Sequence, residues 1–165
     1  MKIFLCPGSA ENQKFKRWPT SNFNILSSFF LNNNWEVGII LGPDEIYLEK
    51  YFNGHEIIKS PSFKKLANIA HNSNLIICND SFLLHFFSFF NINVLGLYGP
   101  TDPNRTLPLN ASKIISSRFS ETRPCWGLPN YGNCDDGRCS CLDGLDPKHV
   151  YEKALAIINR DNNNF

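Results

Sequence analysis

Residues 74–103 have the sequence NLIICNDSFLLHFFSFFNINVLGLYGPTDP. The apolar run in Asn74–Cys78 predicts a buried strand, and Asn93–Tyr98 predicts a second one. Between them, Ser81–Phe90 has the length and apolar content of a helix, with Asp80 as its N-cap. Strand, helix and strand in this order form a βαβ unit, so this stretch predicts an α/β fold with parallel strands.

The rest of the chain continues this alternation. The other expected strands are Lys2–Cys6, Trp35–Leu41, Glu56–Ile58 and Lys113–Ser116. The other expected helices are one opened by Trp18–Ser21 and ending near Leu31, a short one at Asp44–Tyr51, Ser62–His71, and a last one from Asp146–Pro147 to about Asn159. We therefore expect one Rossmann-like domain at residues 1–160, with a doubly wound, mainly parallel sheet, and a frayed tail at 161–165. Ligands of such sheets bind beyond the carboxyl ends of the strands.

The composition limits the classes of function. The 165 residues fit one domain with a core of its own. A composition with 42% hydrophobic and 19% charged residues excludes a disordered chain. The formal net charge is +1, so no overall field attracts nucleic acid, and we expect no nucleic-acid partner. Anion binding must therefore come from a local site.

The apolar segments are too short for membrane insertion or export. The opening run Met1–Cys6 is ended by Pro7 and Gly8, and the longest apolar stretch, Phe82–Phe90, has nine residues. A membrane-spanning helix needs about 20 residues. We therefore expect a cytoplasmic protein.

Polar side chains gather directly after the strand at Asn74–Cys78. A helix N-terminus that begins near Asp80 and Ser81 would favour a phosphate, and His85 lies four residues on, on the same helical face as Ser81. From the residues alone, the favoured interpretation is that Asp80 is only an N-cap and His85 a partly buried residue. A Ser–His–Asp hydrolase is a poor alternative, because Asp80 and Ser81 are adjacent and no G-x-S-x-G turn is present.

Four motifs occur in a set order along the chain. They are C-P-G-S-A followed by K-R-W-P at Lys16–Pro19, L-G-P-D-E ending at Glu45, N-D-S-F-L-L-H, and Y-G-P-T-D-P. In this order they resemble the family-9 glycosyltransferases, the lipopolysaccharide heptosyltransferases, whose patterns include D-S/T-G-x-x-H and F/Y-G-x-T-x-P. The resemblance covers nearly the whole chain and is to the C-terminal half of a two-domain GT-B arrangement.

The resemblance implies a site for a nucleotide-sugar donor, typically ADP-heptose, with no cofactor required. The donor-binding residues that it implies are Ser9, Lys16, Glu45, Asp80, Ser81, His85 and Thr101. In these roles Ser9 and Lys16 contact the diphosphate, where a cation offsets the charge of the leaving group. Glu45 binds the ribose, Asp80 the transferred sugar, and Ser81 and His85 lie at the phosphates. A UDP- or GDP-sugar remains open as the donor.

The same resemblance implies that the chain acts with a second half. In the family, transfer is an inverting displacement at the anomeric carbon, and the N-terminal half supplies the acceptor site and the base. This sequence does not resemble that half, so we expect a separate chain or domain to supply it and no complete reaction from the chain alone. Through a lipid-linked acceptor, peripheral contact with a membrane is also implied.

Phe82 departs from the family pattern, which has glycine at this position. A benzyl side chain here could block a phosphate or could point away from it. The departure leaves open a second class of function, a non-catalytic binding or interaction module. The helix is apolar almost all round, so we expect it to be buried or to form part of an interface; its aromatic residues are Phe82, Phe86, Phe87, Phe89 and Phe90.

Six cysteines fall into two groups. Cys6 and Cys78 lie in apolar runs and are predicted as buried small hydrophobes. The others form C-x8-C-x4-C-x-C in the loop 120–145; they are Cys125, Cys134, Cys139 and Cys141. A structural zinc, a disulfide or free thiols remain open for this group. Paired C-x-x-C knuckles are lacking, a cytoplasmic location disfavours a disulfide, and Cys139 and Cys141 are the best metal candidates.

Overall fold

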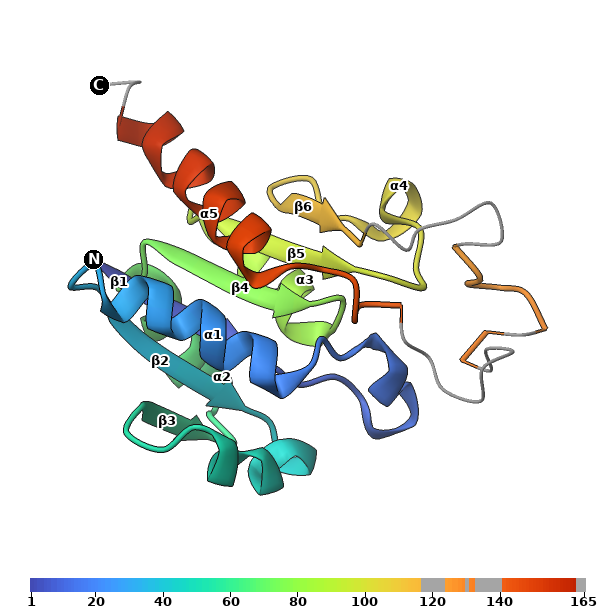
Figure 1. Cartoon of the computed structure of the whole chain (residues 1–165), viewed down its shortest axis with the longest axis horizontal. Coiled ribbons are helices and arrows are strands. Elements are labelled where there is room, and N and C mark those ends of the chain that lie inside the picture. The colour runs from blue at the N-terminus through green and yellow to red at the C-terminus, as the bar shows by residue number, and fades with distance from the viewer. Residues whose placement is uncertain (117–123, 130, 133–140, 163–165) are drawn as a thin grey trace.

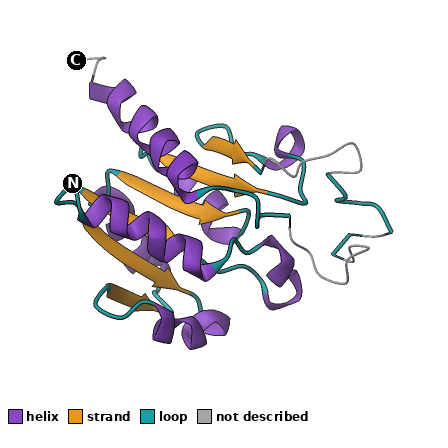
Figure 2. Ribbon diagram, viewed as in Figure 1, coloured by secondary structure: helices purple, strands orange, loops and turns teal. Residues whose placement is uncertain are grey.

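The computed structural model describes residues 1–116, 124–129, 131–132 and 141–162. Within these residues six parallel strands form one sheet in the order β3-β2-β1-β4-β5-β6, and their arrowheads point to one edge (Figure 2). The strands are β1 (Lys2–Cys6), β2 (Glu36–Leu41), β3 (Glu56–Lys59), β4 (Leu75–Asn79), β5 (Val94–Tyr98) and β6 (Ser112–Ile115). The order reverses between β1 and β4, which is where such sheets bind ligands.

Helices cover both faces of the sheet (Figure 1). One face carries α1 (Thr20–Leu31) and α5 (Pro147–Asn162), which pack against each other, and the other carries α2 (Phe63–His71) and α3 (Phe82–Ser88). Three short elements lie in the connections: the 3-10 helices η1 (Glu11–Lys16) and η2 (Pro43–Tyr51), and α4 (Pro103–Thr106). The predicted Rossmann-like, doubly wound sheet is therefore confirmed.

The two faces of β1 show how the sequence divides the core. Ile3 and Leu5 pack with the residues of α1 and α5, whereas Phe4 and Cys6 pack with those of α2 and α3. Successive side chains of a strand point to opposite faces, so an unbroken apolar run is buried on both sides. Cys6 and Cys78 face each other in register and are fully buried, as predicted, and burial raises the pKa of the Cys6 thiol.

Several predicted boundaries need correction. Ser81, not Asp80, is the N-cap of α3, and its side chain makes no capping hydrogen bond. The Asp80 carboxylate instead binds a lysine, as described below, so its predicted role as a helix cap was wrong. The α3 helix ends at Ser88, before the predicted Phe90, and α5 continues to Asn162, so the predicted tail begins inside a helix. The elements η1 and α4 were not predicted.

No helix within the described ranges combines the length and apolar content that a membrane crossing requires.

Candidate functional site

A buried ion pair joins the loops that follow β1 and β4. Lys16, the last residue of η1, places its Nζ 2.8 Å from Oδ2 of Asp80, and the two side chains are 9% and 6% exposed. Burial lowers the pKa of Lys16, but the hydrogen bond and negative charge of Asp80 outweigh it and raise the pKa overall. Lys16 is therefore a buried cation at the point where the strand order reverses.

His85 meets this pair from the exposed side. Its Nε2 lies 4.0 Å from Oδ1 of Asp80, and its side chain is 47% exposed. Asp80 thus has one carboxylate oxygen bonded to Lys16, while the other lies near the His85 ring at a distance too long for a hydrogen bond. The structure brings three of the predicted site residues, Lys16, Asp80 and His85, into one cluster.

Ser9 is buried after β1 and is held by the main chain and an arginine. Its hydroxyl donates to the Gln13 carbonyl at 2.8 Å, while Arg17 Nε donates to the Ser9 hydroxyl at 3.1 Å. Arg17 Nη2 also donates to the Ser9 carbonyl at 2.5 Å, and Nη1 to the Tyr47 hydroxyl at 2.6 Å. Arg17 therefore shapes the loop on which Ser9 lies. This role of Arg17 was not predicted from the sequence, although Arg17 belongs to the K-R-W-P motif.

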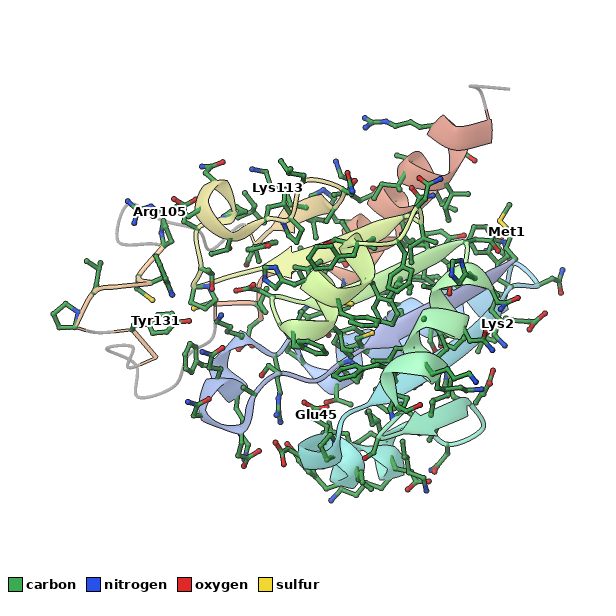
Figure 3. All side chains as sticks on the ribbon, turned by 180° about the vertical axis from the view of Figure 1, so that it is seen from behind. Met1, Lys2, Glu45, Arg105, Lys113 and Tyr131 are labelled. Atoms are coloured by element: carbon green, nitrogen blue, oxygen red, sulfur yellow. The ribbon has the colours of Figure 1, made fainter. Side chains whose placement is uncertain are left out.

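Glu45 lies where η2 leaves the end of β2, and Figure 3 labels it there. The Gly42 N–H donates to its Oε2 at 2.6 Å, and Arg17 Nη2 is 3.8 Å from its Oε1. A Cβ at Gly8 would collide with this carboxylate, so the glycine leaves the space that Glu45 occupies. Burial raises the pKa of Glu45, whereas the hydrogen bond from the Gly42 N–H and the positive charge of Arg17 lower it. Burial is the largest of these effects, so the pKa is raised overall. A buried carboxylate with acceptor capacity to spare suits a ligand that donates hydroxyls.

Asn79 ties the loops together from inside the sheet, and it was missed as a site residue. Its side chain is fully buried; Nδ2 donates to the carbonyls of Pro7 and Gly8 at 2.9 and 3.2 Å, and Oδ1 accepts the Trp18 N–H at 3.0 Å. A polar residue that ends an otherwise apolar strand directly before Asp80 is the signal that could have identified it.

Thr101 follows β5 and is 1% exposed, and its hydroxyl has no hydrogen-bond partner in the described part of the chain. The neighbouring Pro100 carbonyl accepts the N–H groups of Cys125 and Trp126 at 3.0 and 3.2 Å. Thr101 thus lies at the same edge of the sheet, next in the chain to the residue that binds Cys125 and Trp126. Its predicted contact with a donor stays a prediction.

A cavity of about 460 Å³ opens at the same edge of the sheet, and the residue that follows Asp80, Ser81, lines it, whereas Lys16 and Asp80 do not. The ends of β1 and β2 form part of its wall through Gly8, Ser9 and Glu45, and the start of α3 contributes Ser81 and Phe82. Its lining is mainly apolar, and its volume falls within the usual range for ligand sites of about 300–1,000 Å³. Phe82 lies in the wall with 59% of its surface exposed, and the cavity remains open next to it.

The clustered cysteines are only partly described. Cys125 and Cys141 are buried, whereas Cys134 and Cys139 lie outside the described residues. The described ranges contain no group of three or more His, Cys, Asp or Glu side chains close enough to hold a metal ion. The structural zinc therefore stays a prediction, which metal analysis of the purified chain would check.

Comparison with known proteins decides the family. The family model for glycosyltransferase family 9 (heptosyltransferase) matches residues 1–131, which is most of the chain. The chain belongs to glycosyltransferase family 9. The family predicted from the four ordered motifs is thereby confirmed, and with it a heptosyltransferase-like character.

Individual relatives agree with this assignment. Lipopolysaccharide heptosyltransferase 2 of Escherichia coli (strain K12) is 25% identical over 174 residues, which cover 94% of this chain and 46% of the relative. The structure of E. coli ADP-heptose LPS heptosyltransferase II is similar with a TM-score of 0.77 at 20% identity, over 98% of this chain and 47% of that one. For E. coli heptosyltransferase WaaC with ADP, the TM-score is 0.68 at 17% identity, over 94% and 43%. The chain thus spans about half the length of these relatives.

Proposed function

We propose that this family-9 chain is the donor-binding half of a heptosyltransferase and that it binds a nucleotide sugar, ADP-heptose, at the carboxyl ends of its strands. The observation that carries the proposal is the buried Lys16–Asp80 pair, which lies where the strand order reverses. Asp80 directly precedes Ser81, which lines the cavity. A buried cation at the same edge of the sheet as an apolar cavity suits a ligand with a diphosphate at one end and a base at the other.

Each part of the donor has a matching chemical group. Lys16 supplies the positive charge for the diphosphate, and Glu45 in the cavity wall accepts hydrogen bonds from ribose hydroxyls. Oδ2 of Asp80 is bonded to Lys16, whereas Oδ1 points toward His85 and has no hydrogen bond to the lysine. We assign Oδ1 as the acceptor for a hydroxyl of the transferred sugar. In this arrangement the ion pair orients Asp80 and also lowers the cost of burying two charges.

The reaction itself requires a second half. The bond between the anomeric carbon and the diphosphate oxygen breaks, and its electron pair leaves with the diphosphate, whose charge Lys16 stabilises. An acceptor hydroxyl forms the new bond and releases its proton to a base. We assign that base and the acceptor site to a separate domain or chain, because this chain corresponds to about half of each relative.

The relatives favour ADP-heptose over other donors. One solved relative is named an ADP-heptose LPS heptosyltransferase, and another was solved with ADP. The cavity wall consists mainly of apolar groups and backbone, which by themselves select poorly between bases. The donor base must therefore be measured.

Calorimetric titration of the chain with ADP-heptose, ADP, UDP and GDP tests the proposal. We expect ADP and ADP-heptose to bind most tightly, and Lys16→Met to weaken both. Lys14→Met is the matched control, because Lys14 lies on the same 3-10 helix but is half exposed and pairs with Glu11. Lys16→Arg keeps the charge and should retain part of the affinity. Absence of binding by all four nucleotides at millimolar concentration would contradict the proposal and favour an interaction module.

A further inference from the structure

Three phenylalanines form a continuous aromatic cluster, and two of them, Phe63 and Phe82, line the cavity as an aromatic wall. Phe63 begins α2, and Phe82 and Phe86 lie on α3. The ring centroids of Phe63 and Phe82 are 6.1 Å apart, and Phe86 contacts both, at 5.8 Å in each case. These are the distances of direct aromatic contact, so the three rings support one another.

Two of these apolar rings are largely exposed to solvent, and exposed apolar surface is unfavourable in water. Phe63 and Phe82 are 68% and 59% exposed. Both line the cavity, whereas Phe86 does not line it and packs against the apolar core on this face of the sheet. The open surface of the pair therefore faces the space that a ligand would occupy.

The geometry points to Phe82, together with Phe63, as the surface that binds the face of the donor's purine base. This inference rests on the proposed function and extends it to a residue where the family pattern has glycine. A base does not fit between the two rings, since they already touch; it packs against the wall that they present to the cavity. Stacking on an aromatic face is a general way in which proteins bind single bases.

The position of Phe82 explains why it does not block the site. Contacts with Phe63 and Phe86 hold its ring in the wall, and the cavity beside it stays open at about 460 Å³. The Lys16–Asp80 pair belongs to the neighbouring loops, outside the aromatic wall. Phe82 thus adds a contact for the base without removing the cation for the diphosphate.

Substitution of Phe82 by glycine, the residue of the family pattern, tests whether its ring blocks the donor or binds the base. If the ring blocks the donor, Phe82→Gly should bind ADP more tightly; if it binds the base, affinity should fall by roughly tenfold. Phe82→Leu and Phe63→Leu keep an apolar surface without the aromatic face, so we expect a smaller loss from each. Phe89→Leu is the control, because Phe89 ends the same helix and is 86% exposed but does not line the cavity.

NMR of bound ADP measures the contact directly. The chemical shifts of the adenine protons would not change if Phe82 only supported the fold. In the wild-type chain we expect upfield ring-current shifts of the adenine H2 and H8 protons, and we expect Phe82→Leu to reduce them. Unchanged or tighter ADP binding by Phe82→Gly would overturn the inference while leaving the proposed function intact. If the wild-type chain itself binds neither ADP nor ADP-heptose, the proposed function fails and the inference fails with it.

Discussion

Lys16 and Asp80 are 64 positions apart in the sequence, yet Lys16 Nζ and Asp80 Oδ2 lie 2.8 Å apart in a buried site. They meet because β1 and β4 are neighbours in the sheet, so the loops that follow these strands leave the same edge side by side. The ion pair therefore exists only in the folded chain, and it links the loop that holds Ser9 to the start of α3.

Removal of both partners of this pair should cost less than the two single removals added together. Lys16→Met leaves the Asp80 carboxylate buried without its cation, and we expect a loss of about 3 kcal/mol in the free energy of unfolding. The double variant Lys16→Met/Asp80→Leu should lose clearly less than the sum of the single changes, because no unpaired charge remains. Urea unfolding of the four proteins measures this cycle. Strict additivity would contradict the assigned pairing.

Glu45→Gln should change how stability depends on pH. Because burial raises the pKa of Glu45, the folded state keeps this proton at pH values where the unfolded state has released it. The ionisation of Glu45 therefore lowers the free energy of unfolding as the pH rises from about 4.5, its ordinary pKa, to above its raised pKa in the folded state. The glutamine variant lacks this loss, so its free energy of unfolding should gain relative to wild type between pH 4 and 7. Parallel stability curves over that range would show that Glu45 is not the titrating group.

Gly8→Ala should displace the Glu45 carboxylate. The added Cβ would occupy the position of that carboxylate, and the backbone of Gly8 is not in the left-handed region, so the collision is the main effect. The displaced side chain loses the Gly42 N–H, and we expect a cost of about 1–2 kcal/mol together with weaker ADP binding. In a Glu45→Ala background the same change should be nearly neutral. An equal cost in both backgrounds would place the strain elsewhere.

Asn79→Ala should loosen the loop after β1. The variant loses two donor bonds to Pro7 and Gly8 and one acceptor bond from Trp18, all in a fully buried site, which should cost about 3 kcal/mol. Asn79→Asp should cost at least as much, because an ionised carboxylate cannot donate to the two carbonyls. Asn72→Ala is the control on the exposed end of α2 and should cost little. Thermal unfolding ranks the three variants; equal melting temperatures would refute the anchoring role.

The sequence predicted the fold well because the information that specifies it is local. Short apolar runs followed by glycine, proline or polar residues marked each strand, and their alternation with amphipathic segments indicated a parallel sheet. The ordered motifs then indicated the family. The short elements η1 and α4 were missed because they have too few residues to show a helical period.

The site was predicted less well because its bonds are long-range. Asp80 was expected to cap a helix, whereas it binds Lys16, and no local pattern distinguishes these two uses of an aspartate. Arg17 and Asn79 were missed for the same reason, since their partners become neighbours only when the loops meet at the sheet edge. The volume of the cavity beside Phe82 likewise depends on how α2 and α3 pack, which the sequence does not state.

The most direct test of the central claim is a two-dimensional ¹H–¹⁵N NMR titration of the 18.8 kDa chain with ADP. The amides of Gly8, Ser9, Gly42, Asp80 and Ser81 surround the ion pair and the cavity, and we predict that they shift most as ADP is added. Shifts confined to other parts of the chain, or no shifts at millimolar ADP, would contradict a donor site at the carboxyl ends of these strands.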